Sequence, residues 1–187
     1  MKWMLVAGIV LAAIILAVVV VGTLLPRDHV ATVGARIPEP PDSVWRTIAD
    51  VADHPTWRDG VTRVELLAPI EGKTSWREHS TNRAILMVAD VAEPPRRLVT
   101  RIADDRLPFG GTWEFVVEPA GDNASTVTIT ERGSVYNPVF RFMSRFVFGH
   151  TATMDAYLRS LGRKFAGDSA SSTVAVSPRA SRGNHGL

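Results

Sequence analysis

The chain of 187 residues contains no cysteine. This absence excludes disulfide bonds, thiolate nucleophiles and metal sites built on cysteine. The 21 basic and 19 acidic residues are interspersed, with no run of lysine and arginine that would suit nucleic acid or a polybasic lipid contact. The sequence also lacks a Gly-rich phosphate loop, a Ser-His-Asp arrangement and histidines at metal-ligand spacing. We therefore expect no nucleic-acid partner, no metal and no cofactor.

Long apolar runs are confined to residues 1–26. From Met4 to Val21 no side chain is charged or strongly polar. The hydrocarbon core of a bilayer is about 30 Å thick and takes roughly 20 helical residues, so residues 3–25 predict a single-pass membrane anchor. A cleaved signal peptide is the alternative, although its apolar region usually spans only about 7–15 residues. The side of the membrane stays open, because basic residues flank the segment at both ends: Lys2, Arg27, Arg36 and Arg46.

Residues 27–167 predict one α+β domain, and residues 168–187 predict a disordered tail rich in Ser, Ala, Gly and Arg. A β-branched strand over 29–37 precedes a helix that begins near Pro41, since proline suits the first helical turn. A second short helix or turn is expected around Trp57. Apolar residues then recur at every second position in six runs separated by turn residues, at 61–67, 73–79, 84–91, 97–102, 111–119 and 125–136. Short connections between these runs favour an antiparallel sheet.

Asn137 and Pro138 form a strong helix start, as N-cap and first helical residue. Apolar residues at three- and four-residue spacing predict one long helix from there to Phe165, ending at Gly167. Its opposite face carries arginines, among them Arg141. Such a helix is the element available to cover the buried face of the sheet.

Two segments carry a resemblance to a known family: IPEPPDSVWRTIADVADHPTWRDGV at 37–61 and GTWEFVVEPAGDNASTVTITERGSVYNPVFRFMSRFVFG at 111–149. They resemble the START-like, or SRPBCC, superfamily, which includes polyketide cyclase/dehydrase-like proteins. The resemblance covers about residues 29–166. It implies the helix-grip fold, in which a curved antiparallel sheet of six to seven strands wraps around a long C-terminal helix. It also implies a cavity between sheet and helix, where members place a hydrophobic ligand.

Strand alternation indicates which side chains would line that cavity. Trp113 and Phe115 lie on the face opposite Glu114, and by parity the carboxylates Glu78 and Glu131 fall on the inner face. The expected cavity wall consists of Trp57, Trp76, Ile85, Met87, Trp113, Phe115, Ile129, Glu131, Met143, Val147, His150 and Met154.

Three residues are candidates for acid–base chemistry: Glu78, Glu131 and His150. A buried carboxylate has a raised pKa and can transfer protons. The alternative is that the two carboxylates pair with arginines and that His150 is packed on its helix. The tryptophans could likewise be core instead of cavity wall.

The fold hosts lipid carriers, cyclases, hydrolases and receptors, so it does not determine function. We expect a membrane-anchored domain that binds a hydrophobic small molecule, lipid or polyketide-like. A cyclase or dehydratase is the second hypothesis, and a scaffold filled by its own side chains is the third. The start of the long helix (residues 139–148) is apolar on nearly all sides, which suits either full burial or a membrane-facing lip at the cavity mouth.

Overall fold

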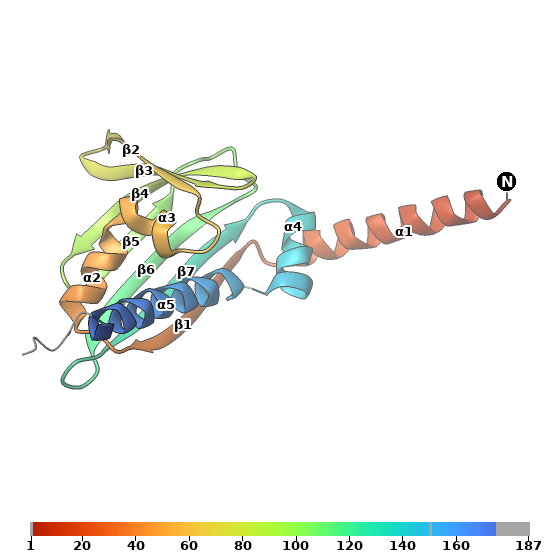
Figure 1. The fold of residues 1–187 in the computed structure, drawn as a ribbon. Coiled ribbons are helices and arrows are strands. Elements are labelled where there is room, and N and C mark those ends of the chain that lie inside the picture. The colour runs from red at the N-terminus through yellow and green to blue at the C-terminus, as the bar shows by residue number, and fades with distance from the viewer. Residues whose placement is uncertain (1, 150, 175–187) are drawn as a thin grey trace, which may run out of the picture.

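A seven-stranded antiparallel sheet curves around helix α5 in the computed structural model, which describes residues 2–149 and 151–174 (Figure 1). The strand order is β1-β7-β6-β5-β4-β3-β2, so the first and second strands of the chain form the two edges. This arrangement confirms the α+β helix-grip fold. The strands are β1 (Asp28–Ile37), β2 (Arg63–Ile70), β3 (Lys73–Ser80), β4 (Arg83–Glu93), β5 (Arg97–Ile102), β6 (Phe109–Pro119) and β7 (Ser125–Val135).

Helices precede and follow the sheet. Short helices α2 and α3 connect β1 to β2, and α4 and α5 follow β7 (Figure 1). The bounds are α1 (Lys2–Leu24), α2 (Pro41–Ala49), α3 (His54–Trp57), α4 (Pro138–Met143) and α5 (Ala152–Val174), with a 3₁₀ turn η1 (Val51–Asp53) and a π-helical turn η2 (Ser144–Phe148).

Local sequence explains where these helices begin. Pro41 occupies the first turn of α2, where its missing N–H leaves no hydrogen bond unmade. The Asn137 side chain accepts hydrogen bonds from the backbone N–H groups of Val139 and Phe140, which caps α4 as expected. On α2 the apolar residues Val44 and Ile48 are one turn apart, and both are buried against the sheet.

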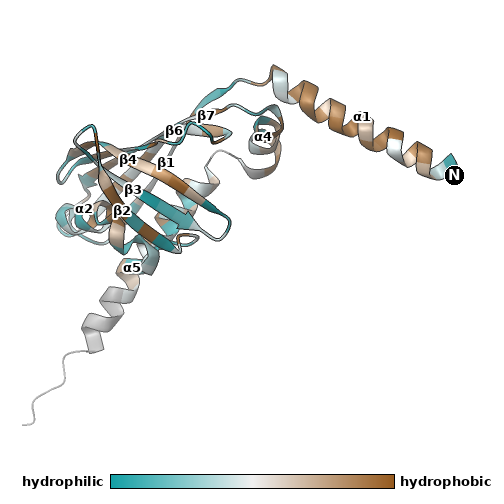
Figure 2. Cartoon of the chain, turned by 90° about the horizontal axis from the view of Figure 1, so that it is seen from above, coloured by the Kyte–Doolittle hydropathy of each residue, from teal (hydrophilic) through white to brown (hydrophobic). Residues whose placement is uncertain are grey.

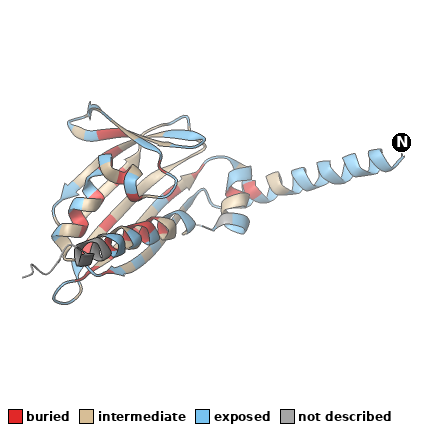
Figure 3. Ribbon diagram, viewed as in Figure 1, coloured by how far each residue is buried: buried red, intermediate tan, exposed pale blue. Residues whose placement is uncertain are grey.

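The space between α5 and the sheet is filled at one end. Leu158, Leu161 and Phe165 of α5 pack there against Val127 and other residues of β6 and β7. Along both strands the core residues lie toward the β6–β7 hairpin, and Figure 3 shows the buried positions on α5 facing the sheet. The opposite end, which is nearer to α4 and α1, is where a cavity forms.

The predicted single helix over 137–165 is wrong. The chain leaves the helix at Gly149, whose φ of 73° and ψ of 167° lie in a region open almost only to glycine. Consequently α4 and η2 form a separate unit, and their apolar residues do not continue the buried face of α5. The helix also does not end at Gly167, since α5 continues to Val174. Residues 175–187 of the expected tail lie outside the described residues.

Helix α1 projects away from the domain with its apolar side chains exposed (Figure 2). Among the described residues it is the one helix long and apolar enough to cross a membrane, a property that a signal sequence shares. Near its end it packs against α4, where Gly22 is buried. A Cβ at Gly22 would lie 2.1 Å from the carbonyl oxygen of Pro138, so only glycine permits this contact.

Arg141 was expected on the polar face of a long helix, and this expectation is wrong. The side chain is buried between α4 and the end of α1. Its Nη1 donates a 2.9 Å hydrogen bond to the carbonyl of Leu25, and its Nη2 donates a 3.4 Å bond to the carbonyl of Tyr136. Arg141 therefore ties the start of the C-terminal helices to the residue that follows α1.

Candidate ligand-binding site

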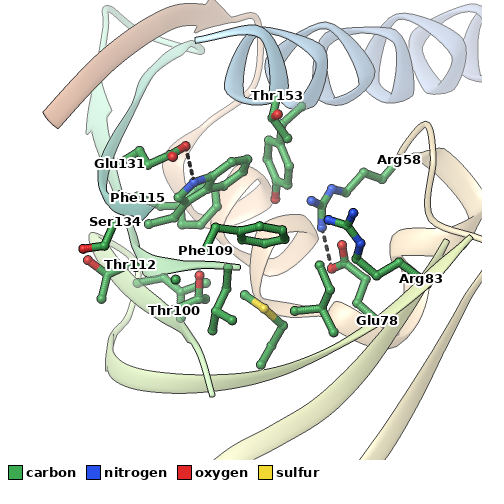
Figure 4. Close-up of a pocket in the computed structure, with 18 of the residues that line it drawn as sticks. Arg58, Glu78, Arg83, Thr100, Phe109, Thr112, Phe115, Glu131, Ser134 and Thr153 are labelled. Carbon is green, nitrogen blue, oxygen red and sulfur yellow. Dashed lines mark hydrogen bonds and ion pairs between the residues drawn. The ribbon is translucent and has the colours of Figure 1, made fainter. Parts of the chain in front are cut away.

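A cavity of about 380 Å³ lies between the inner face of the sheet and the first turns of α5. Ligand pockets in proteins range upward from about 300 Å³, so the space suits a small organic molecule. Its walls come from β1, β3 to β7, the short helices α2, η1 and α3, the start of α5 and the α4–η2 unit. Figure 4 shows the side chains that point into it.

The floor of the cavity is apolar. It is made by inward-facing residues of neighbouring strands, which stand opposite one another in the sheet register: Trp76 pairs with Met87, and Met87 pairs with Ile102. Ile85 and Leu98 extend the same surface. Apart from Nε1 of Trp76, a buried N–H with no hydrogen-bond partner in the described chain, this part of the wall is apolar and favours an apolar body in the ligand.

A first polar group lies where α3 meets β3. Nη1 of Arg58 donates a 2.6 Å hydrogen bond to Oε2 of Glu78, and both side chains are mostly buried. The guanidinium also stacks over the rings of Tyr157 and Trp113, at 4.9 and 5.9 Å from their centres. The ion pair and the two rings hold Arg58 in one place at the cavity wall.

Two buried polar atoms beside this ion pair have no hydrogen-bond partner within the described chain: the hydroxyl of Tyr157 and Nδ1 of His54. Both residues line the cavity. Burial raises the pKa of Tyr157, so the hydroxyl is protonated and can donate. Unpartnered polar atoms are costly in a protein interior, and here both belong to residues of the cavity wall.

His54 is neutral at pH 7. Burial lowers the pKa of His54 to about 4, and the positive charge of Arg58 acts in the same direction. The hydrogen bond between His54 and the backbone of Ile48 raises the pKa by a smaller amount. Nε2 lies 3.1 Å from the carbonyl oxygen of Ile48, which can only accept, so Nε2 carries the proton. Nδ1 is therefore an acceptor. Together the Tyr157 hydroxyl and His54 Nδ1 provide one donor and one acceptor.

A second polar group lies on β6 and β7. Nε1 of Trp113 donates a 2.8 Å hydrogen bond to Oε2 of Glu131, its cross-strand neighbour, and Nε2 of His29 lies 3.0 Å from Oε1. All three residues line the cavity. In Figure 4 the ring of Phe109 lies between Glu131 and the Arg58–Glu78 pair. The cavity thus has two separate polar groups with apolar surface between them.

The cavity reaches the surface beside the α4–η2 unit. Phe140 of α4, Ser144 of η2 and Gly149 line this end, together with Thr153 at the start of α5. Phe140 is 45% exposed while also lining the cavity, so it marks the boundary between cavity and surface. In the part of the chain that the structure describes, no three His, Asp or Glu side chains gather in a way that could hold a metal ion.

A family model for polyketide cyclase / dehydrase and lipid transport matches residues 28–166. The chain belongs to this family. A comparison with curated proteins finds no significant match.

Solved structures share the fold of this polyketide cyclase-like domain. The Zhui aromatase/cyclase from Streptomyces sp. R1128 superposes with a TM-score of 0.62 at 14% identity, over 74% of this chain and 94% of that one. A START superfamily protein from Mycobacterium smegmatis gives 0.58 at 13% identity, over 74% and 98%. A norcoclaurine synthase mutant from Thalictrum flavum, in complex with a transition-state analogue, gives 0.60 at 11% identity, over 76% and 96%. At such identities the likeness shows the fold alone.

Several residues predicted from the sequence do line the cavity of the polyketide cyclase-like domain. Strand parity places both carboxylates on the inner face, and Glu78 pairs with an arginine as the alternative had it, but the partner is Arg58 and not Arg77, Arg83, Arg101 or Arg132. The lining residues among those predicted are Trp76, Glu78, Ile85, Met87, Trp113, Phe115 and Glu131.

Other predicted residues lie elsewhere. Trp57, Ile129 and Met154 are buried in the core and do not line the cavity. Met143 and Val147 belong to the α4–η2 unit, which the break at Gly149 turns away from the sheet, and Val147 is 57% exposed. His150 lies outside the described residues.

The polar residues of the wall that the sequence did not reveal include His29, His54, Arg58 and Tyr157. Tyr157 lies on the apolar stripe of α5, where its ring looks like any core aromatic. Arg58 directly follows the Pro55–Trp57 turn, and its closeness to Glu78 across 20 residues of chain appears only in the fold.

Proposed function

We propose that residues 28–166 bind a hydrophobic small molecule that carries oxygen functions, and that α1 holds the domain at a membrane. The cavity carries this proposal: an apolar floor lies between two polar groups, and one of these includes a buried donor and acceptor without partners in the described chain. A ligand hydroxyl or carbonyl near Tyr157 and His54 would satisfy those atoms, and Met87 and its neighbours would cover the ligand's apolar body.

The proposed anchor rests on the length of α1 and on its exposed apolar surface. Holding the domain at a bilayer raises the local concentration of lipid-soluble ligands without any new contact. The intact mass of the mature protein from membranes tests this part. Retention of residues 1–26 supports an anchor, and their loss supports a cleaved signal sequence.

Native mass spectrometry of the full chain, released from detergent, tests the ligand. Met87 faces the cavity, and Leu86 on the same strand faces the outside. We expect Met87→Trp to reduce a copurified small-molecule adduct strongly and Leu86→Trp to leave it unchanged. Lipid bound around α1 would survive both substitutions, so the comparison isolates the cavity. An adduct that is equally abundant in all three proteins contradicts the proposal.

The second candidate function is acid–base catalysis of the cyclase or dehydratase type. One observation favours it: Glu131 and His29 form a carboxylate–imidazole pair on the cavity wall, within reach of a bound molecule. The Zhui protein is named as an aromatase/cyclase. For a catalytic Glu131, Glu131→Gln would abolish turnover and leave ligand affinity nearly unchanged. Equal loss of both assigns Glu131 to binding.

A further inference from the structure

We propose that the α4–η2 unit, residues 138–148, docks on the same bilayer that α1 spans, so that the cavity opens directly into the lipid. The ligand would then enter sideways from the leaflet without crossing water. This inference rests on the proposed anchoring by α1 and names the source of the ligand, a lipid or lipid-dissolved molecule of one leaflet. Four features of the described chain support it.

The first feature is the position of the contact between α1 and α4. On α1 the covered residues are Val18, Val19 and Gly22, all in its last two turns. From Val18 to Leu24 the helix rises by about 9 Å. The whole helix of 23 residues is about 35 Å long, against a hydrocarbon core of about 30 Å. Helix α4 therefore lies beside the outermost part of the span, at the level of the lipid headgroups and the first acyl carbons.

The second feature is that this contact is tight. The backbone of Pro138 touches α1 at Gly22, and buried Arg141 bonds to the carbonyl of Leu25. Only three residues join α1 to β1, and their backbone is itself bonded: the carbonyl of Arg27 accepts a 2.8 Å bond from the N–H of Val135. Because the α4–η2 unit is fixed to the end of α1, insertion of α1 sets the depth of that unit.

The third feature is the exposed surface of the unit. Val139, Phe140, Phe146 and Val147 are 40%, 45%, 59% and 57% exposed. Exposed aromatic and aliphatic side chains next to a membrane span are typical of segments that lie in the interface. Arg145 is exposed on the same turn, where its charge can meet lipid phosphate.

The fourth feature is continuity with the cavity. Phe140 and Ser144 of this unit line the open end of the cavity, and Gly149 completes the edge. In Figure 1 the unit lies between the open end of the domain and the base of α1, while the β6–β7 hairpin is at the far end. A molecule that passes Phe140 moves from the bilayer into the cavity.

The absence of cysteine makes the test direct, since each introduced cysteine is the only one in the full chain. We would attach the fluorophore NBD at four positions in turn. Ile14→Cys lies in α1, Phe146→Cys on the exposed surface of the unit, Ser144→Cys at the cavity edge and Asp122→Cys in the β6–β7 hairpin. The protein is reconstituted in vesicles of phosphatidylcholine and phosphatidylglycerol, with brominated acyl chains as lipid quencher and iodide as aqueous quencher.

We expect brominated lipid to quench the labels at 14, 146 and 144, and iodide to quench the label at 122 alone. If iodide quenches the label at position 146 while brominated lipid quenches the label at position 14, the docking of the α4–η2 unit is wrong, but α1 is still a membrane anchor. If lipid quenches 146 and iodide quenches 144, sideways entry is wrong. If neither quencher reaches 146 and pulsed EPR finds two spin-labelled copies close together, a second chain covers the unit and the inference falls. If iodide quenches the label at position 14, the anchoring by α1 is itself wrong.

Discussion

The guanidinium carbon of Arg58 lies 4.9 Å from the centre of the Tyr157 ring, and its Nη1 hydrogen-bonds to Glu78. Arg58 therefore joins α3, β3 and α5 at one point of the cavity wall. The charge is compensated by Glu78 and by the face of the ring, while the Tyr157 hydroxyl has no partner in the described chain. Under the proposed function, structural support and ligand recognition are divided between neighbouring groups, and substitutions can separate them.

Glu78→Gln should lower the free energy of unfolding by about 2 kcal/mol, because it leaves a mostly buried guanidinium without its counter-charge. Chemical unfolding of the full chain in detergent measures this. The double variant Arg58→Met, Glu78→Gln should lose less than the sum of the single variants, since the pair acts as a unit. Glu65→Gln is the control: its contacts with Arg63, Arg77 and His79 are all 3.4–3.6 Å long and its side chain is 41% exposed, so we expect a change below about 0.5 kcal/mol. Additive losses would show that the Arg58–Glu78 contact contributes nothing.

Tyr157→Phe should leave the stability of the unliganded domain unchanged or raise it slightly, because it removes a buried hydroxyl that no described residue satisfies. Affinity for the cavity ligand should fall roughly fivefold, which corresponds to one lost hydrogen bond of about 1 kcal/mol. Titration of the variant with the ligand identified by mass spectrometry provides the measurement. A loss of stability instead would mean that the hydroxyl has a structural partner, such as a buried water.

His54 should make the domain less stable in mild acid. Its pKa is about 4 in the folded protein and about 6.5 in the unfolded chain, so above pH 6.5 both states are neutral and His54 costs nothing. Between pH 6.5 and 4, His54 is protonated in the unfolded chain but stays neutral in the folded protein. This difference lowers the free energy of unfolding by about 3 kcal/mol at pH 4. His54→Gln, which keeps a donor for the Ile48 carbonyl, should flatten this part of the stability curve measured from pH 7 to 4. An unchanged slope would assign the acid sensitivity to other groups.

The two glycines of α1 should respond to alanine with opposite signs. Gly8 has open space around it, so Gly8→Ala gains helix propensity, up to about 1 kcal/mol. Gly22→Ala places a methyl group against the backbone of Pro138 and should destabilise the α1–α4 contact by about 1–3 kcal/mol. Pulsed-EPR distances between labels at Leu16→Cys and Asp122→Cys should broaden in the Gly22→Ala background alone. Equal distributions in both backgrounds would show that α4 does not fix the angle of α1.

The strands could be predicted because alternation and turns are local signals. Trp113, Phe115 and Val117 occupy every second position of β6, and the structure places them on the inner face, as strand parity predicted. The break at Gly149 could not be predicted in the same way. The apolar periodicity of the buried α5 continues without interruption into the apolar surface of the α4–η2 unit, so two helices with different neighbours read as one. Gly149 was the only sign of the division, and an isolated glycine inside an apolar pattern is tolerated in many helices.

The cavity was predictable only where the sheet alone determines it. Parity brought Glu131 beside Trp113 because both lie on paired strands. Arg58, His29 and Tyr157 reach the wall through the packing of α3, the edge strand β1 and α5. Those positions depend on how elements distant in sequence are arranged in space. Met154 shows the same limit: it shares the inner stripe of α5 with Tyr157, yet it is fully buried in the core.

The connection of Leu25, Pro26 and Arg27 between α1 and β1 spans at most about 10 Å. A tether of that length cannot carry the domain to an opposing membrane, and the hydrogen bonds from Arg141 and Val135 hold it further. With α1 in a bilayer, the domain stays at that bilayer and cannot carry a ligand from one membrane to another. Cargo would have to arrive by diffusion within one leaflet, and any enzyme or transporter that receives it would have to meet the domain in that same plane.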